Sequence, residues 1–366
     1  MTTTTTEPTG GGGAPDATPT AARQRRSGGL GSYLLVRFLL IFPTIFILVT
    51  TVFVLMRLTG DPITAAQGGR LPAEELARRI AEAGYDRPIL VQYWEYLGQL
   101  VQGDFGTAIS DGREISDMLT SFGAATLELA FYALIVAFAV GIPLGRLAAY
   151  LRDRWPDAVL RVFAILCYAT PVFFAGLLLK LVFAVNLGWL PVAGRASTGA
   201  EIQLQQQDSS TGIYLIDALK LGDGDVIQDV LEHAVLPAVA LGLLTAGVFL
   251  RLVRTNVIGT LGSGYVEAAR SRGVSERRLL RKHAYRPALI PIVTVIGLQI
   301  ALLLGGAVLT ETTFEWKGLG FQLVEYLQAR DFVAVQGIVV LAAVIVALVN
   351  FVVDVIAALI DPRVRY

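Results

Sequence analysis

Long apolar stretches alternate with shorter polar segments along the whole chain. Six of these stretches approach or exceed the ~20 residues that a helix needs to cross a bilayer. They cover residues 33–58, about 124–147, about 159–185, about 235–250, about 288–309 and about 332–360. A helix satisfies its backbone polar groups internally, as lipid requires, and the runs lack the alternation of a membrane β-strand. The pattern therefore predicts an all-α, polytopic membrane protein with six transmembrane helices.

The placement of charge predicts how these helices are oriented. With the N-terminus inside, the four cytoplasmic segments carry 19 Lys or Arg, and the three opposite segments carry 10 over a greater length. Acidic residues show the reverse bias, since 21 of them lie in the outer segments. Because basic residues favour cytoplasmic loops, we expect both termini to be cytoplasmic.

The polar segments divide the chain into parts. Residues 1–32 are Thr, Gly, Pro and Ala with little apolar bulk, which predicts a disordered cytoplasmic tail before the first membrane helix at 33–58. Residues 59–123 form an extracytoplasmic segment in which two amphipathic helices separate near residues 86–88. Residues 124–365 form a core with five transmembrane helices. Within it, residues 187–233 make a second outer excursion, whose Gln-rich stretch 197–211 we interpret as a mobile insertion.

Composition restricts the chemistry that the chain can perform. Hydrophobic residues make up 54% and charged residues 16%, against about a quarter charged in soluble domains. The single cysteine, Cys167, excludes an intrachain disulfide, and two distant histidines argue against a His/Cys metal site. No lysine follows a glycine, so the chain has no phosphate-binding loop of the G-x-x-x-x-G-K type. We predict a non-enzymatic protein without catalytic residues, metal or cofactor.

A basic cytoplasmic block from Gly264 to Pro287 interrupts the apolar pattern. Residues 265–272 can form two helical turns that place Tyr265, Ala268, Ala269 and Arg272 on one face. Gly273 is a natural C-cap, and the small alanines allow a partner surface to approach closely.

The second half of the block predicts another helix. Ser275 is a suitable N-cap for residues 276–285, and Pro287 is expected to end that helix because the residue before a proline disfavours α conformation. The block then reads as helix, glycine hinge and helix between two membrane spans.

We consider three kinds of binding partner for this block. A nucleic acid is disfavoured, because aromatic platforms are scarce and the block adjoins a membrane. Lipid headgroups suit its second half, with Arg277, Arg278, Arg281 and Lys282. A cytoplasmic protein better explains Glu267, the alanine pair and the glycine hinge.

The stretch "YVEAARSRGVSERRLLRKHAYRPALIPIVT" resembles the EAA loop of binding-protein-dependent ABC importer permeases of the dipeptide and oligopeptide type. Further landmarks agree in order over about residues 33–365, among them "RLTGDP", "DRPILVQYWEYLGQLVQGDFGTAI", "NLGWLPVAG", "GGAVLTETTFEWKGLG" and "VNFVVDVIAALIDPRVR". The resemblance implies a type I importer permease fold, similar to that of methionine importers, in the inner membrane.

The resemblance also implies partners and a coupling role. Those partners are two ABC ATPase subunits, a second homologous permease, an extracytoplasmic solute-binding protein and a peptide-like solute. The EAA helix would couple the ATPases to the membrane helices through Tyr265, Glu267, Ala268, Ala269, Arg272 and Gly273. Nickel, glutathione or another small solute stays an alternative to a peptide, and an ATPase-independent secondary transporter is a more remote one.

A second group of residues is a candidate for the solute pathway or its gate. It comprises Pro171, Lys180, Glu311, Phe314 and Trp316. Pro171 and Gly176 could kink the third span as a gating helix requires, although ordinary helix packing explains them as well. Lys180 either extends to the outer interface or provides a charge to the pathway or between helices.

Overall fold

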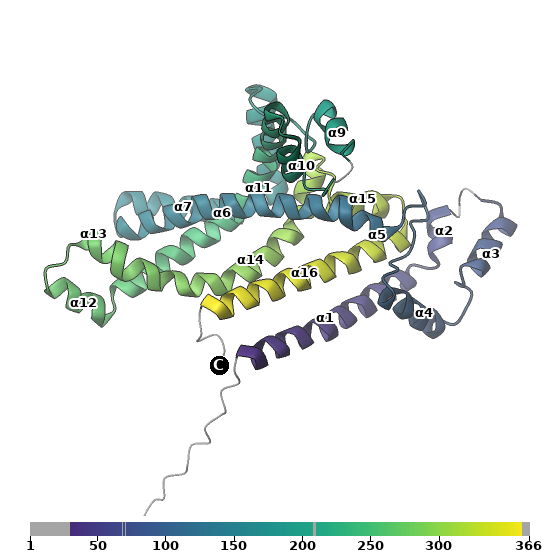
Figure 1. The fold of residues 1–366 in the computed structure, drawn as a ribbon, viewed down its shortest axis with the longest axis horizontal. Helices are drawn as coiled ribbons and strands as arrows, with labels where there is room; N and C mark the ends of the chain where they lie inside the picture. The colour runs from purple at the N-terminus through teal and green to yellow at the C-terminus, as the bar shows by residue number, and fades with distance from the viewer. Residues whose placement is uncertain (1–29, 68, 70, 208–209, 361–366) are drawn as a thin grey trace, which may run out of the picture.

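The computed structural model describes residues 30–67, 69, 71–207 and 210–360, and in these residues it contains helices and no strand (Figure 1). The fold is therefore all-α, as predicted. Residues 1–29 of the predicted tail and residues 361–366 lie outside the described residues. The first helix begins at Leu30, three residues earlier than expected.

Two groups of helices make up the fold. The long or apolar ones are α1 (Leu30–Leu58), α6 (Ala124–Tyr150), α7 (Trp155–Ala169), α8 (Val172–Leu179) with the π-helix η2 (Lys180–Asn186), α11 (Gly224–Leu261), α14 (Tyr285–Phe314) and α16 (Phe332–Ile360). The shorter ones are α2 (Pro62–Gln67), α3 (Ala73–Glu82), α4 (Ile89–Val101), α5 (Ile115–Met118), η1 (Leu119–Gly123), α9 (Thr198–Gln205), α10 (Tyr214–Leu221), α12 (Gly264–Ser271), α13 (Glu276–Arg278), η3 (Leu279–Ala284) and α15 (Leu319–Gln328).

Among the described residues, four helices are long and apolar enough to cross a membrane. They cover Gly31–Leu58, Ile115–Tyr150, Gly224–Leu261 and Phe332–Ile356, and a bent pair formed by α7 with α8 and η2 makes a fifth if it counts as one span. The predicted span at 288–309 lies within α14, where the shorter apolar stretch Leu302–Phe314 is found. The count of six stays a prediction.

The third predicted span is not one straight helix. It breaks at Thr170 and Pro171, and the two parts meet at 106°. Thr170 is extended, with φ −80° and ψ 126°, because a proline ring excludes the residue before it from the α region. Pro171 then precedes α8 directly and starts a new helix direction.

Glycines bring α6 and α11 into close contact at the centre of the bundle. A Cβ on Gly141 would lie 2.7 Å from the Ala246 carbonyl oxygen, and one on Gly145 would lie 2.7 Å from that of Leu250. Glycines four residues apart are typical of membrane helices whose backbones pack directly. This pair forms the framework on which the other helices are placed.

The two ends of the bundle carry different short helices. In Figure 1, α12 and α13 lie at the same end as the start of α1 and the end of α16, whereas α2, α3, α4 and α15 lie at the opposite end. An ion pair of 3.4 Å between Arg37 and Asp354 joins α1 to α16 near the first end. This arrangement agrees with the prediction that the two termini and the basic block lie on the same side of the membrane. Which side faces the cytoplasm stays a prediction.

Residues 59–123 contain the predicted helix pair. Pro72 precedes α3, with Glu74 and Glu75 in the first turn, and Pro88 precedes α4. Proline suits such positions because the N–H that it lacks has no partner inside the helix.

Residues 187–233 are more ordered than expected. Ser197 caps α9, since its hydroxyl accepts a hydrogen bond from the amide of Ala200 at 3.4 Å. Leu204 is buried against Ala218 and Val230, so α9 packs on α10 and α11. The interpretation of 197–211 as a loose insertion is therefore wrong for its described residues, because apolar positions along α9 give it a packing face.

Candidate functional site

The exposed face of α12 is the first candidate site. Tyr265 is 50% exposed, and Glu267, Ala268 and Arg272 are also exposed. Ala269, predicted on the same face, is instead buried at 4% exposure. It lies three residues from Val266, which is fully buried, and the two form the inward side of the helix.

Gly273 ends α12 in the predicted way. Its φ of +80° is left-handed, a region that favours glycine. The amide of Gly273 donates to the Arg270 carbonyl at 2.9 Å, and the amide of Val274 donates to the Ala269 carbonyl at 3.3 Å. These two bonds close the helix and reverse the chain direction.

The helix after the hinge differs from the prediction. Glu276–Arg278 form one helical turn, η3 follows, and α14 begins at Tyr285, so Pro287 does not end the helix. Pro287 instead occupies the first turn of α14, and proline is tolerated in a first turn. The basic block is therefore continuous with the next membrane helix.

Two contacts fasten α12 to this second arm. The Arg270 guanidinium pairs with Glu276 at 2.6 Å, and the Tyr265 hydroxyl donates to the His283 carbonyl at 3.1 Å. Among the described residues, no hydrogen bond or ion pair engages the Glu267 carboxylate. Glu267 is thus available to a basic partner.

Two consecutive leucines connect α12 to the membrane core. Leu279 is fully buried with Val266 and Ala269 beneath α12. Leu280 points into a different cluster, which contains Val253 of α11 and Ala288 of α14. The segment η3 therefore packs against α12 on one side and against α11 and α14 on the other.

The second candidate site lies at the opposite end, where α14 meets α15. Glu311 is completely buried, and its carboxylate accepts hydrogen bonds from the Thr126 hydroxyl at 2.6 Å and the Phe321 amide at 2.9 Å. The Trp316 indole Nε1 donates to the Ala125 carbonyl at 2.9 Å. Both predicted residues therefore fasten the α14–α15 turn to the start of α6.

Glycines make room for this carboxylate. A Cβ on Gly318 would lie 2.5 Å from the Glu311 carboxyl carbon, and a Cβ on Gly320 would lie 3.0 Å from its Oε2. The "KGLG" segment thus surrounds Glu311 with backbone. Thr126 also accepts the amide of Leu319 at 2.9 Å, so it bridges α6 and the turn.

Lys180 and Phe314 meet at the end of the bent span. The Lys180 ammonium donates to the Thr313 carbonyl at 2.8 Å and lies 5.7 Å from the centre of the Phe314 ring. Lys180 was expected either to extend to the interface or to provide a charge to the pathway or between helices. Its bond to Thr313 agrees with a contact between helices. Phe314 is buried against Gly176, where a Cβ would lie 2.9 Å from the ring, so this glycine serves close packing. Pro171, at the break, is exposed.

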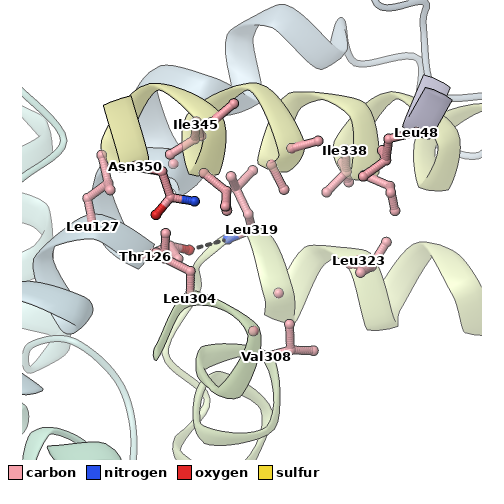
Figure 2. Close-up of a pocket in the computed structure, with 18 of the residues that line it drawn as sticks. Leu48, Thr126, Leu127, Leu304, Val308, Leu319, Leu323, Ile338, Ile345 and Asn350 are labelled. Atoms are coloured by element: carbon pink, nitrogen blue, oxygen red, sulfur yellow. Dashed lines mark hydrogen bonds between the residues drawn. The ribbon is translucent and has the colours of Figure 1, made fainter. Parts of the chain in front are cut away.

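A cavity of about 380 Å³ lies between α1, α6, α14, α15 and α16 (Figure 2). Its wall is mainly apolar, and Thr126 and Asn350 lie at the same end of it. Glu311 lines it, whereas Pro171, Lys180, Phe314 and Trp316 do not. Such a wall suits apolar groups better than the charged ends of a peptide.

Two ion pairs, each with a buried carboxylate, were not predicted from the sequence. Glu128 and Arg195 are 3% and 5% exposed and pair at 2.5 Å, which ties α6 to the second outer excursion. Asp157 accepts two hydrogen bonds from Arg254, at 2.6 and 2.7 Å, and joins the start of α7 to α11. The charges were visible in the sequence, but the pairs span 67 and 97 residues, and no local pattern matches them.

Comparison with known proteins gives consistent matches. A family model described as binding-protein-dependent transport system inner membrane component matches residues 141–366. The di/tripeptide transport system permease protein DppB of Pseudomonas aeruginosa is 37% identical over 337 residues, covering 92% of this chain and 99% of that protein. The dipeptide transport system permease protein DppB of Escherichia coli K12 is 38% identical, covering 91% and 98%.

Further similarities extend to another solute and to a solved structure. The glutathione transport system permease protein GsiC of Salmonella choleraesuis is 35% identical over 336 residues, covering 92% of this chain and 99% of that protein. A chain of the inward-facing methionine ABC transporter MetNI gives a TM-score of 0.48 at 17% identity, covering 65% of this chain and 93% of that chain.

The family model covers more than half of the chain, and the relatives extend the similarity over about nine tenths of it. Several helices of membrane length accompany that similarity, so this is a multi-pass protein of the inner membrane. The chain belongs to the family of binding-protein-dependent transport system inner membrane components.

Proposed function

We propose that the chain is the permease subunit of an ATP-driven ABC importer for dipeptides and other short peptides. Membership of the family supports a role in binding-protein-dependent transport. The peptide assignment is supported by two relatives, named as dipeptide or di/tripeptide permeases, that align over nearly their whole length. In this proposal the permease itself hydrolyses nothing, and partner ATPases supply the energy.

The observation that carries the mechanism is the connection between α12 and the bundle. The exposed Tyr265, Glu267, Ala268 and Arg272 form the face that meets an ATPase subunit, and Gly273 sets the angle of the helix. When the ATPases close, α12 moves, Leu279 follows it, and Leu280 moves α11 and α14. The membrane helices then exchange an inward-open for an outward-open arrangement.

We assign the remaining partners on the same basis. Two ATPase subunits and a second homologous permease complete the transporter, and a solute-binding protein delivers peptide to the outer end. The gate is formed where the bent span meets α14, with Pro171 at the break and Lys180 and Phe314 at the contact. Glu311 and Trp316 hold the turn beside this gate in position.

The test compares two charge reversals in the first turn of a helix. Glu267→Lys changes the proposed ATPase face, and Glu74→Lys changes an exposed glutamate of α3 at the opposite end. Both variants are purified with the cognate ATPases from membranes. We expect Glu267→Lys to lose the ATPases and Glu74→Lys to retain them. Normal recovery of ATPases with Glu267→Lys would refute the assignment of α12.

Glutathione is the second candidate solute, because GsiC is 35% identical over nearly its full length. Nickel stays a further alternative. Uptake into proteoliposomes that contain the complete transporter and its binding protein separates them. Competition of labelled dialanine by dipeptides, but not by glutathione or nickel, is the result that the proposal requires.

A further inference from the structure

A second cavity, of about 300 Å³, lies at the outer end of the bundle, opposite α12. The end of α1, the turn before α4, α4 itself, residues 105–109 and the start of α16 enclose it. Its polar lining includes Arg57, Gln92, Glu95, Tyr96 and Gln336. It shares none of its lining residues with the cavity of Figure 2.

Arg57 is the main charge of this cavity. Its guanidinium lies over the rings of Tyr85 and Phe53, at 4.7 and 5.0 Å from their centres. Its Nε and Nη1 are buried without a hydrogen-bond acceptor, and no carboxylate of the described residues forms an ion pair with it. The two rings therefore hold a cation that keeps two unused hydrogen-bond donors, Nε and Nη1.

Gln92 and Tyr96 add further unused groups from α4. Gln92 is 8% exposed, and its Nε2 donates to the carbonyls of Arg87 at 2.8 Å and Tyr85 at 3.1 Å, but its Oε1 accepts no bond. The Tyr96 hydroxyl is buried and faces the Gln336 side chain, but it makes no hydrogen bond of good geometry. Burial raises the pKa of Tyr96 to about 12, so this hydroxyl keeps its proton and can donate.

These groups are concentrated to an unusual degree. Six buried side-chain polar atoms lack a partner in the described part of the chain, and four of them belong to Arg57, Gln92 and Tyr96. Leaving a buried donor or acceptor unpaired is unfavourable, and such groups are found where a ligand or water completes the bonding. Their gathering around one cavity indicates a ligand site.

The unused groups define the chemistry of the ligand. A guanidinium and a phenol hydroxyl suit a carboxylate, and the Gln92 Oε1 needs a donor such as an ammonium or amide group. Glu95 adds an acid to the wall, although Arg87 already pairs with it at 2.6 Å. The volume lies at the lower end of the range for small-molecule sites.

We propose that this cavity binds a small zwitterionic carboxylate, a free amino acid or a dipeptide, with its carboxylate on Arg57 and Tyr96. The site lies in the outer segment and does not depend on the ATPases or on the coupling role of α12. It would respond to solute outside the cell without being part of the solute pathway.

The test measures binding to the full-length permease in nanodiscs, without ATPases or binding protein, by calorimetric titration. The probes are alanine, dialanine and dialanine amide, which lacks the carboxylate. We expect alanine or dialanine to bind, dialanine amide to bind at least about tenfold more weakly, and Arg57→Gln to weaken dialanine by about tenfold or more. Arg113→Gln, a surface arginine of the same segment, is expected to match the unchanged protein.

Tyr96→Phe provides a variant that keeps the fold. Because the hydroxyl makes no protein hydrogen bond of good geometry and faces only the Gln336 side chain, its removal is expected to change the melting temperature little while affinity for the probe falls. The proposal is overturned if neither alanine nor dialanine binds, if the amide binds equally well, or if Arg57→Gln and Tyr96→Phe bind normally. Loss of ATPase coupling in α12 variants leaves this measurement unaffected, so the two proposals fail separately.

Discussion

Leu279 and Leu280 are neighbours in the chain but belong to different packing clusters. Leu279 lies beneath α12 with Val266, and Leu280 lies in the bundle with Val253 and Ala288. This places the boundary between α12 and the helix bundle within η3.

Leu279→Ala is expected to uncouple the ATPases from the membrane helices. The substitution leaves a gap under α12 and costs about 2–5 kcal/mol locally, so motion of α12 no longer reaches η3 fully. In proteoliposomes with the full transporter, peptide uptake should fall while basal ATP hydrolysis continues. Leu280→Ala is the matched comparison, since it should lower the melting temperature of the bundle. Normal uptake by a folded Leu279→Ala transporter would contradict the proposed connection.

The Glu128–Arg195 pair predicts a strongly coupled double variant. Arg195→Met leaves a buried carboxylate without its cation, which costs about 3–5 kcal/mol. Glu128→Gln in the same chain removes the charge and should restore much of that loss, because an amide oxygen still accepts from the Leu215 amide. Thermal unfolding of the two single variants and the double variant in nanodiscs measures the coupling. Additive losses would show that the pair does not interact.

The glycine contact between α6 and α11 predicts opposite effects at two glycines. Gly145→Ala pushes a methyl group into the Leu250 carbonyl and should destabilise the chain by about 1–3 kcal/mol. Gly98→Ala in α4 meets open space and should be neutral or stabilise by up to about 1 kcal/mol. Melting temperatures in the same nanodiscs decide between these outcomes, and equal behaviour of both variants would contradict the close contact.

The left-handed conformation of Gly273 predicts a local effect of Gly273→Ala. A side chain at φ +80° costs about 1–2 kcal/mol, so the closure of α12 by Val274 weakens. Hydrogen exchange should become faster in residues 264–278 and stay unchanged in α6. Gly259→Ala, which meets open space within α11, serves as the control. Equal protection of α12 in both variants would mean that the hinge geometry is unimportant.

The buried tyrosines of the outer segment predict alkaline sensitivity. Burial raises the pKa of Tyr96 from 10.0 to about 12 and raises that of Tyr85 as well. Because the folded state holds the phenol proton more tightly, this stability is complete below pH 10 and is lost as the pH rises towards 12. Ultraviolet absorbance of tyrosinate should include Tyr85 and Tyr96 among the late-titrating groups, and their ionisation should coincide with opening of the segment. Tyr96→Phe should remove one of them.

The features that could be predicted from sequence are local ones. The apolar stretches act through transfer to lipid. The prolines before α3 and α4 and Gly273 act through their own backbone. All of them can therefore be predicted from sequence without knowledge of tertiary contacts. Glu267 and the exposed part of α12 belong to this group as well. The family was therefore recognisable from motifs before any contact was known.

Contacts between distant segments were decided by the tertiary structure. Ala269 turned inward because Leu279 closed against it after the hinge, and the second helix continued past Pro287 because η3 joined it to α14. Glu311 accepts a hydrogen bond from Thr126, 185 residues away, and Arg195 forms an ion pair with Glu128. The sequence by itself determined most of the long helices and the local breaks at Pro72, Pro88 and Gly273, because these choices depend on neighbouring residues. Only the three-dimensional packing decided the partner of each buried charge and the 106° bend after Thr170, because both depend on which helices meet.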